Sequence, residues 1–378
     1  MKFIVHKNNY NKNNKDLMFE KRAFFGRSKF CMKKINYFFG ILITSISINS
    51  IQAQDLHFSQ VYETPLFLSP ANTGFFNGYT RAIVNYKSQW AAMNNAFQTT
   101  AISVDGGLFR SKKHPAFLGL GLTFFNDKAG SANLGKTTIQ LNVSGLVKLA
   151  KRSALSAGVA FGSAASNANF NQLTYASQFN GNSIDPTIVS GEIPYRQFTT
   201  IDVGAGLAYE YSKSASDEDH DDISSIKFAI GAFHLNKPIQ EFGAGSAYVL
   251  PVRYVFSLTS NFDLVDTKFT ITPTIIYQSQ ASMNELLIGS YLKFRMSSGT
   301  KVTGKYTQNA IGAGVFFRKN DAIVAKFIFD KGDYSIGLAY DFNVSGYSRV
   351  SKSFGGPEIS LRYNKLASSL SNSKRELK

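Results

Sequence analysis

The sequence predicts an all-β fold, a transmembrane antiparallel β-barrel of about fourteen strands, and three observations support this. Apolar residues alternate with small or polar residues along many separate blocks, which is typical of strands with two different faces. Most blocks are about 9 to 13 residues long, the length with which a tilted strand crosses a bilayer. A basic pair, an uncharged apolar run and a small residue follow one another near the amino terminus, the order of an export signal.

The alternation is clearest near the carboxyl end of the chain. Tyr334, Ile336, Leu338, Tyr340 and Phe342 fall on one face of a strand, and the residues between them fall on the other. The same rule sorts thirteen further blocks. The predicted strands cover residues 80–90, 97–107, 116–126, 139–149, 153–162, 201–211, 225–234, 250–260, 267–278, 285–296, 309–318, 321–329, 334–342 and 357–364.

A soluble β-sandwich or propeller is the competing fold, because its strands alternate too. Such strands are usually nearer five or six residues long, and the 14% aromatic content suits the aromatic girdles of a membrane barrel. No segment after Gln54 has the roughly 18 to 20 apolar residues that a spanning helix needs. Lipid cannot hydrogen-bond a backbone, so a spanning sheet must close on itself.

The amino-terminal residues are read as export and processing segments. Residues 32–53 form the predicted signal peptide, with Lys33 and Lys34 before the apolar run and Ala53 at its exit. A retained membrane helix is the alternative. Residues 1–31 are a predicted upstream extension, with Met32 as the start. Ten of the 41 Lys and Arg residues lie within residues 1–34, so the formal net charge of +16 gives little support for nucleic-acid binding.

The predicted mature chain has three parts. Residues 54–79 do not alternate and contain Pro65 and Pro70, so we expect a periplasmic segment or a partial plug. Residues 80–364 form the predicted barrel, and residues 365–378 a tail. With an even strand count and a periplasmic start, the longest connection, residues 163–196, faces the cell exterior. Pro273 interrupts a predicted strand, and we expect a β-bulge there.

No catalytic, cofactor or metal site is predicted. The histidines lack metal-ligand spacing, and the acidic run 217–222 has Asp222 where a calcium loop needs glycine, so a solvated turn is favoured. A Ser-His-Asp triad assembled from separate strands stays open, although no nucleophile elbow is present. Two Gly-Ala-Gly runs, 204–206 and 312–314, lie within strands and are interpreted as small lumen-facing residues. Six charged residues on predicted inner faces could line a channel or pair with one another in a filled lumen: Arg253, Glu285, Lys293, Arg295, Lys326 and Asp341.

Several short motifs, taken in order, resemble the PorP/SprF family of outer-membrane proteins associated with type IX secretion and gliding in Bacteroidota. The start of the predicted mature chain has the family's pattern QD..FSQ followed by PA..G. Later blocks resemble the family's Y-R-x-Q-W motif, its glycine-rich strand and loop, a loop entry, a late hairpin and the terminal strand. The matching residues are Gln54, Asp55, Phe58, Ser59, Gln60, Pro70, Ala71, Gly74, Tyr86, Lys87, Gln89, Trp90, Asp127, Gly130, His234, Pro238, Arg318, Asp321 and Glu358.

The resemblance implies location in the outer membrane, no enzymatic activity and no cofactor. It implies as partners outer-membrane lipid, a secreted type IX cargo or adhesin, and other type IX secretion components. Lys87 stands where the family commonly has arginine, which keeps the charge but loses the bidentate fork. A passive porin or small-solute transporter is the alternative function, and a hydrolytic outer-membrane enzyme is a third.

Overall fold

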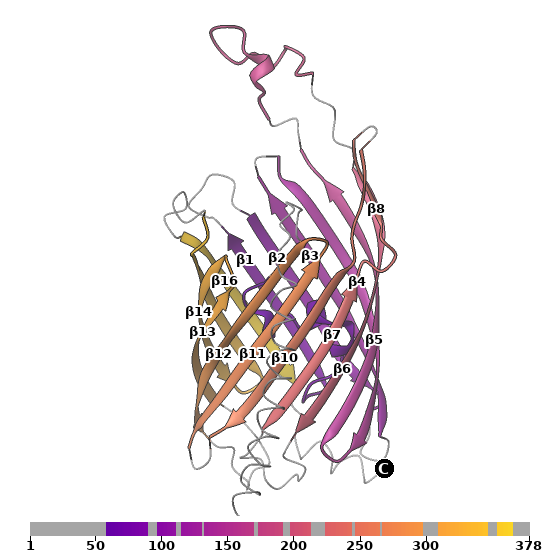
Figure 1. The fold of residues 1–378 in the computed structure, drawn as a ribbon, viewed down its shortest axis with the longest axis vertical. Coiled ribbons are helices and arrows are strands. Elements are labelled where there is room, and N and C mark those ends of the chain that lie inside the picture. The colour runs from indigo at the N-terminus through magenta and orange to yellow at the C-terminus, as the bar shows by residue number, and fades with distance from the viewer. Residues whose placement is uncertain are drawn as a thin grey trace, which may run out of the picture. The chain divides into compact units, whose positions relative to one another are not determined.

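A computed structural model shows a closed barrel of fourteen antiparallel strands together with a separate two-stranded sheet (Figure 1). The predicted fold class is confirmed. The structure describes residues 58–89, 97–110, 115–130, 132–169, 173–191, 197–212, 224–243, 246–264, 267–297, 309–346 and 354–365. Among these residues, no helix is long and apolar enough to cross a membrane.

Each barrel strand pairs with its neighbours in chain order, and β1 pairs with β16 to close the sheet. The barrel strands are β1 Thr80–Gln89, β2 Phe97–Leu108, β3 Ala116–Ala129, β4 Leu134–Ala150, β5 Ser153–Asn167, β6 Phe198–Ser212, β7 Ser225–Phe233, β10 Arg253–Asp263, β11 Phe269–Gln280, β12 Met283–Ser297, β13 Asn309–Arg318, β14 Ala322–Lys331, β15 Tyr334–Asn343 and β16 Phe354–Lys365. The separate hairpin joins β8 Ile239–Gly243 to β9 Ser246–Val249 and lies between β7 and β10 in the chain.

The alternation in the sequence becomes the two faces of the barrel wall. In β15, Ile336 and Leu338 are exposed on the outside, while Ser335 and Asp341 are buried on the lumen side. The other strands repeat this arrangement because successive side chains of a strand point to opposite faces. Apolar side chains therefore cover the outside. The inner face carries small, polar and charged side chains together with a buried apolar cluster that includes Val255, Leu287 and Phe316.

All fourteen predicted strand blocks are present, with three differences. Strands β3 to β6 contain 14, 17, 15 and 15 residues, longer than the predicted blocks, because their polar outer ends do not alternate. The β8–β9 hairpin was not predicted. The bulge expected at Pro273 is wrong: β11 keeps one register with β12 through Pro273, and its pairing with β10 only lapses opposite that residue.

The two ends of the barrel differ in their connections. We call the end where β1 begins and β16 finishes the terminal end, and Thr80 pairs there with Lys365. We call the opposite end the loop end. It carries the connection between β5 and β6, the β8–β9 hairpin, and the short turn between β13 and β14. In Figure 1 the loop end is at the top.

Closure of the sheet leads to the first testable expectation. Because every barrel strand has two neighbours, the purified protein should stay folded in SDS at room temperature and migrate faster than after boiling. Gel electrophoresis of boiled and unboiled samples measures this directly. Identical migration of the two samples in detergent-extracted protein would contradict a closed barrel.

Candidate functional site

Residues 58–78 lie within the barrel, and we call them the luminal plug. The plug contains three short helical turns, η1 Val61–Glu63, α2 Pro65–Leu68 and η2 Pro70–Asn72, in the indigo part of the ribbon in Figure 1. Its prolines explain the broken pattern in the sequence, because a proline starts a helical turn but cannot join a strand ladder. Most of its side chains are buried, and Phe58, Leu66 and Phe67 pack against the inner wall.

At the loop end the plug is held by the carboxylate of Glu358 in β16. The backbone N–H groups of Ser59 and Gln60 donate to its two oxygens, at 2.7 and 2.9 Å. The Gln60 side-chain amide donates to the Glu358 carbonyl at 2.9 Å and accepts from the Ser360 hydroxyl at 2.8 Å. Asn85 of β1 donates to the same carboxylate at 2.9 Å. A buried carboxylate is thus satisfied by donors from the plug and from β1.

A second set of charges surrounds Ser59. Its hydroxyl donates to the Asp341 carboxylate at 2.8 Å and accepts from the Arg318 guanidinium at 3.1 Å. Arg318 is 1% exposed and also forms an ion pair with Asp341, and Lys87 lies 3.5 Å from Asp341. These contacts join segments far apart in the sequence. We call the set Ser59, Gln60, Lys87, Arg318, Asp341 and Glu358 the polar lock.

Further along, the plug backbone runs against a row of small residues in the wall. Gly119, Ser144, Gly158, Gly206 and Gly231 are direct cross-strand partners from β3 to β7, and we call them the glycine row. A Cβ at Gly231 would lie within 3.0 Å of the Leu68 carbonyl. Only residues without side-chain bulk allow the two backbones to come so close.

The same stretch of the plug is also hydrogen-bonded to the wall. The Ser144 hydroxyl donates to the Thr73 carbonyl at 2.6 Å, and the Ser156 hydroxyl donates to the Ala71 carbonyl at 2.6 Å. The Ser69 hydroxyl donates to the Ile230 carbonyl of β7 at 2.8 Å. The glycines of the wall therefore let the plug backbone come close, and the serines of the wall donate hydrogen bonds to plug carbonyls that would otherwise be buried without a partner.

The plug leaves the lumen at the terminal end, where a buried ion pair of the wall holds it. Arg81 and Asp105 pair at 2.8 Å, and the Asp105 carboxylate also accepts the Gly74 N–H at 2.8 Å. Gly74 has φ of 65°, a conformation that favours glycine, and this fits its place in the PA..G motif. The Tyr79 N–H then donates to the Lys365 carbonyl at 2.9 Å, so the plug crosses the lumen from the loop end to the terminal end.

The six charged residues assigned to inner faces all point inward, and several are paired. Lys293 pairs with Asp330 at 2.9 Å, and Arg295 with Asp263 at 3.3 Å. The Arg253 guanidinium lies 4.0 Å from the Phe67 ring centre. Of the two interpretations of these charges, the structure supports paired charges in a filled lumen.

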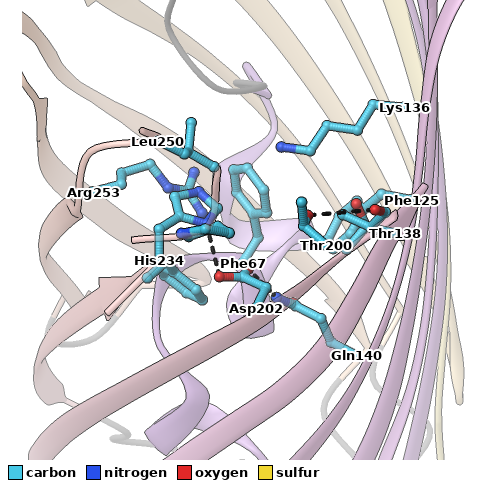
Figure 2. Close-up of a pocket in the computed structure, with 13 residues that line it drawn as sticks. Phe67, Phe125, Lys136, Thr138, Gln140, Thr200, Asp202, His234, Leu250 and Arg253 are labelled. Atoms are coloured by element: carbon cyan, nitrogen blue, oxygen red, sulfur yellow. Dashed lines mark hydrogen bonds and ion pairs between the residues drawn. The ribbon is translucent and has the colours of Figure 1, made fainter. Parts of the chain in front are cut away.

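A small pocket lies beside the plug at the loop end (Figure 2). Phe67 of the plug, Asp202 of β6 and His234 after β7 line it, together with Lys136 and Arg253. The His234 Nδ1 lies 2.8 Å from the Asp202 carboxylate, and Gln140 donates to that carboxylate at 3.1 Å. The cavity measures about 30 Å³, room for one or two waters.

Of the remaining described residues of the family motifs, Asp321 contacts the polar lock and the others lie outside it. Tyr86 points outward and is 41% exposed, and Gln89 ends β1. Asp127 accepts from Thr99 at 2.6 Å, Gly130 occupies a turn with φ of 69°, and Pro238 lines the small pocket. Asp321 accepts from Arg318 at 2.6 Å. Gln54, Asp55 and Trp90 fall outside the described residues.

Sequence reasoning missed several contact residues. Ser360 of the wall donates to Gln60 of the plug. Asn85 supports the Glu358 carboxylate that holds the plug, and Arg362 pairs with Glu63 of the plug at 2.9 Å. Polar residues on the inner face of a strand were the available signal, but alternation cannot say what they meet inside.

Fold and site together define a membrane β-barrel whose lumen is occupied by its own amino-terminal segment. The family described as "Type IX secretion system membrane protein PorP/SprF" matches residues 50–363, and the chain belongs to this family. The protein is therefore a type IX secretion membrane protein located in the outer membrane.

Comparison with known proteins adds the following likenesses. No curated protein matches. The chain is similar to the crystal structure of BamA from Haemophilus ducreyi lacking POTRA domains 1–3, with 9% identity and a TM-score of 0.41 over 76% of this chain and 70% of that one. It is also similar to the CymD monoaromatic hydrocarbon channel, with 10% identity and a TM-score of 0.41 over 81% and 93%. The toluene transporter TodX of Pseudomonas putida has 8% identity and a TM-score of 0.37 over 82% and 93%.

Proposed function

We propose that this barrel docks a protein exported by the type IX system and helps to place or retain it at the cell surface. The observation that supports this proposal is the luminal plug, which is bound to the wall at both ends and packs closely along the glycine row. A lumen filled in this way suits a rigid support better than a solute channel. The porin alternative gains no specific support from the geometry.

In this proposal the loop end faces the cell exterior and the terminal end faces the periplasm. Outer-membrane barrels have long outer loops and short periplasmic turns, and an even strand count brings both chain ends to the periplasmic side. The connection between β5 and β6, residues 168–197, is the longest at the loop end. It is thus placed to contact an exported partner.

The described part of that connection has the character of a contact surface. Phe179, Ile184 and Val189 are 55%, 47% and 86% exposed, although they lie beyond the strands that lipid covers. Local bonds shape the segment: Phe179 and Ile184 form a β-bridge, and the Asp185 carboxylate accepts from the Thr187 N–H and hydroxyl at 2.9 and 2.6 Å. These two bonds lower the pKa of Asp185. Exposed apolar side chains on a shaped polar loop are suited to binding protein.

Replacing Phe179 and Val189 together with serine tests this function. We expect cells carrying the double variant to lose about tenfold or more of the surface-bound exported partner, because anchor residues at the centre of an interface can each contribute 2 kcal/mol or more. Immunodetection on whole cells of a surface protein that is exported by the type IX system measures the effect. Heat-modifiable migration shows that the barrel itself is intact.

Two controls accompany this experiment. Replacing exposed Ile239 of the β8–β9 hairpin with serine removes a similar apolar side chain from another part of the loop end. Deleting the whole gene gives the amount of partner that stays on the surface without the barrel. The proposal fails if surface retention persists in the deletion strain while solute permeability falls, since that result defines a porin.

A further inference from the structure

The small pocket beside the plug contains two cationic side chains that the proposed function does not use. Lys136 of β4 and Arg253 of β10 both line it, and Figure 2 shows them reaching into the cavity from opposite sides. Phe67 of the plug lines the same cavity. Two strands that are not neighbours in the sheet, together with the plug, thus enclose one small space.

The Arg253 guanidinium is held in a fixed position. Arg253 is 4% exposed, and its guanidinium carbon lies 4.0 Å from the centre of the Phe67 ring and 4.6 Å from the centre of the Phe233 ring. Aromatic faces attract a guanidinium and limit its rotation. The planar N–H fork is then already oriented, and this fork matches the two oxygens of a carboxylate.

The charges around the cavity favour an anion. Among the described residues that line it, Asp202 is the one with a carboxylate. One oxygen of this carboxylate lies 2.8 Å from the His234 Nδ1, and the other accepts from the Gln140 amide at 3.1 Å. Lys136 and Arg253 bring two positive charges against the single negative charge of Asp202. A surplus of positive charge in a largely buried space attracts a negative ligand more strongly than it would in water.

The backbone at His234 also suggests a site that is held in shape. His234 has φ of 60°, in the left-handed region that residues other than glycine seldom adopt. Such conformations persist where the surroundings hold them, and they cluster at ligand-binding sites. The contact with Asp202 fixes the His234 side chain at the edge of the cavity.

The size and lining of the cavity limit the ligand. Its volume of about 30 Å³ is about twice what one water needs, which suits a single carboxylate group and excludes a sugar or a nucleotide. Phe67 and Leu250 supply an apolar surface for a hydrogen or methyl group. Lys136 and Thr200 are half-buried, whereas Arg253 is buried, so a ligand would enter beside Lys136 and Thr200.

We propose that this pocket binds a small carboxylate between the Arg253 guanidinium and the Lys136 ammonium group. The bound carboxylate would connect β4 with β10 beside Phe67 and would thereby hold the plug in the lumen. This binding site goes beyond the proposed function, because it uses none of the exposed loop residues assigned to docking. A free small acid and the carboxyl end of a polypeptide present the same group, and the experiment below separates these two sources.

A titration with ¹³C-formate tests the site in the purified, detergent-solubilised protein. The wild-type protein should broaden the formate resonance and leave that of neutral formamide unchanged. Lys136→Met should weaken formate binding at least about tenfold, the effect of losing one charge-assisted hydrogen bond. Lys128→Met is the matched control, because Lys128 is exposed on the outer face of the neighbouring strand β3 and should leave the affinity unchanged.

A second measurement follows the plug itself. Formate should slow protease cleavage of residues 58–78 in the wild-type protein and in Lys128→Met, but not in Lys136→Met. Heat-modifiable migration shows that each variant is folded. The proposal is overturned if the wild-type protein leaves formate unbroadened, if formate and formamide behave alike, or if the two lysine variants lose equal affinity.

The source of the carboxylate is found by competition. A short glycine-serine peptide with a free carboxyl end is compared with the same peptide ending in an amide. Displacement of formate by the acid form alone supports a site for the end of a polypeptide. Retention of formate in the presence of both peptides supports a site for a free small acid.

Discussion

Replacing Arg318 with methionine is expected to lower the free energy of unfolding by about 3 to 5 kcal/mol, the cost of breaking a buried ion pair by removing one partner. Arg318 is 1% exposed and contacts Asp341, Asp321 and the Ser59 hydroxyl. Methionine fills similar space but leaves the Asp341 carboxylate buried without its guanidinium partner, with Lys87 3.5 Å away. Denaturant titration in detergent micelles, followed by the unboiled band in SDS, measures the loss.

The neighbouring residue provides the matched control. Lys319 is also basic and is exposed in the turn after β13, so Lys319→Met should change the free energy of unfolding by less than about 0.5 kcal/mol. A double variant, Arg318→Met with Asp341→Asn, removes both charges and should recover part of the loss, because no uncompensated carboxylate remains. Equal effects of Arg318→Met and Lys319→Met would show that the polar lock does not stabilise the plugged barrel.

The Arg318→Met substitution should also change how firmly the plug is held in the lumen. Ser59 accepts from Arg318 and donates to Asp341, so loss of Arg318 should loosen the plug at the loop end first. The contacts at the terminal end do not involve Arg318: Gly74 is held by Asp105. Partial protease digestion should therefore cut near residue 59 before it cuts near residue 74.

Much of the fold could be predicted from the sequence, because the two faces of every barrel strand have different surroundings, lipid on one side and the packed lumen on the other. Lipid outside and a packed polar interior inside impose a period of two, and that period is visible in β15 without knowledge of any contact. The β8–β9 hairpin escaped because its strands have five and four residues, too few to show a period. The bulge predicted at Pro273 was wrong because a missing N–H can be tolerated by a lapse in pairing without a change of register.

The site was less predictable, for a physical reason. Ser59, Arg318 and Glu358 were singled out by family resemblance, but their meeting depends on how a non-periodic segment folds inside the barrel. The glycine row poses the same difficulty. Gly158, Gly206 and Gly231 are 48 and 25 residues apart in the chain, and only the register of three strands makes them neighbours. Small inward residues could be recognised from the sequence, whereas the plug that needs them could not.

Replacing glycines of the glycine row with a larger residue is expected to open the lumen. A Cβ at Gly206 would lie within 3.0 Å of the Ser69 hydroxyl, and one at Gly158 would lie 2.5 Å from the Pro70 carbonyl. Valine at both positions cannot coexist with the plug backbone, and overpacking of this kind typically costs about 1 to 3 kcal/mol per site. The closed sheet does not depend on the plug for its hydrogen bonds, so the plug should move while the barrel remains.

Planar-bilayer recording distinguishes the plugged from the open barrel. The wild-type protein should show little steady conductance, and Gly158→Val with Gly206→Val should show discrete steps and faster cleavage of residues 58–78 by protease. Gly145→Val is the matched control, because it lies in the neighbouring strand β4 and a Cβ there meets nothing within 4 Å. Steady conductance in the wild type equal to that of the double variant would contradict a lumen closed by the plug. It would also remove the reason for preferring a docking function to a channel. That preference depends on the space beside the wall glycines being filled by the plug backbone rather than by solute.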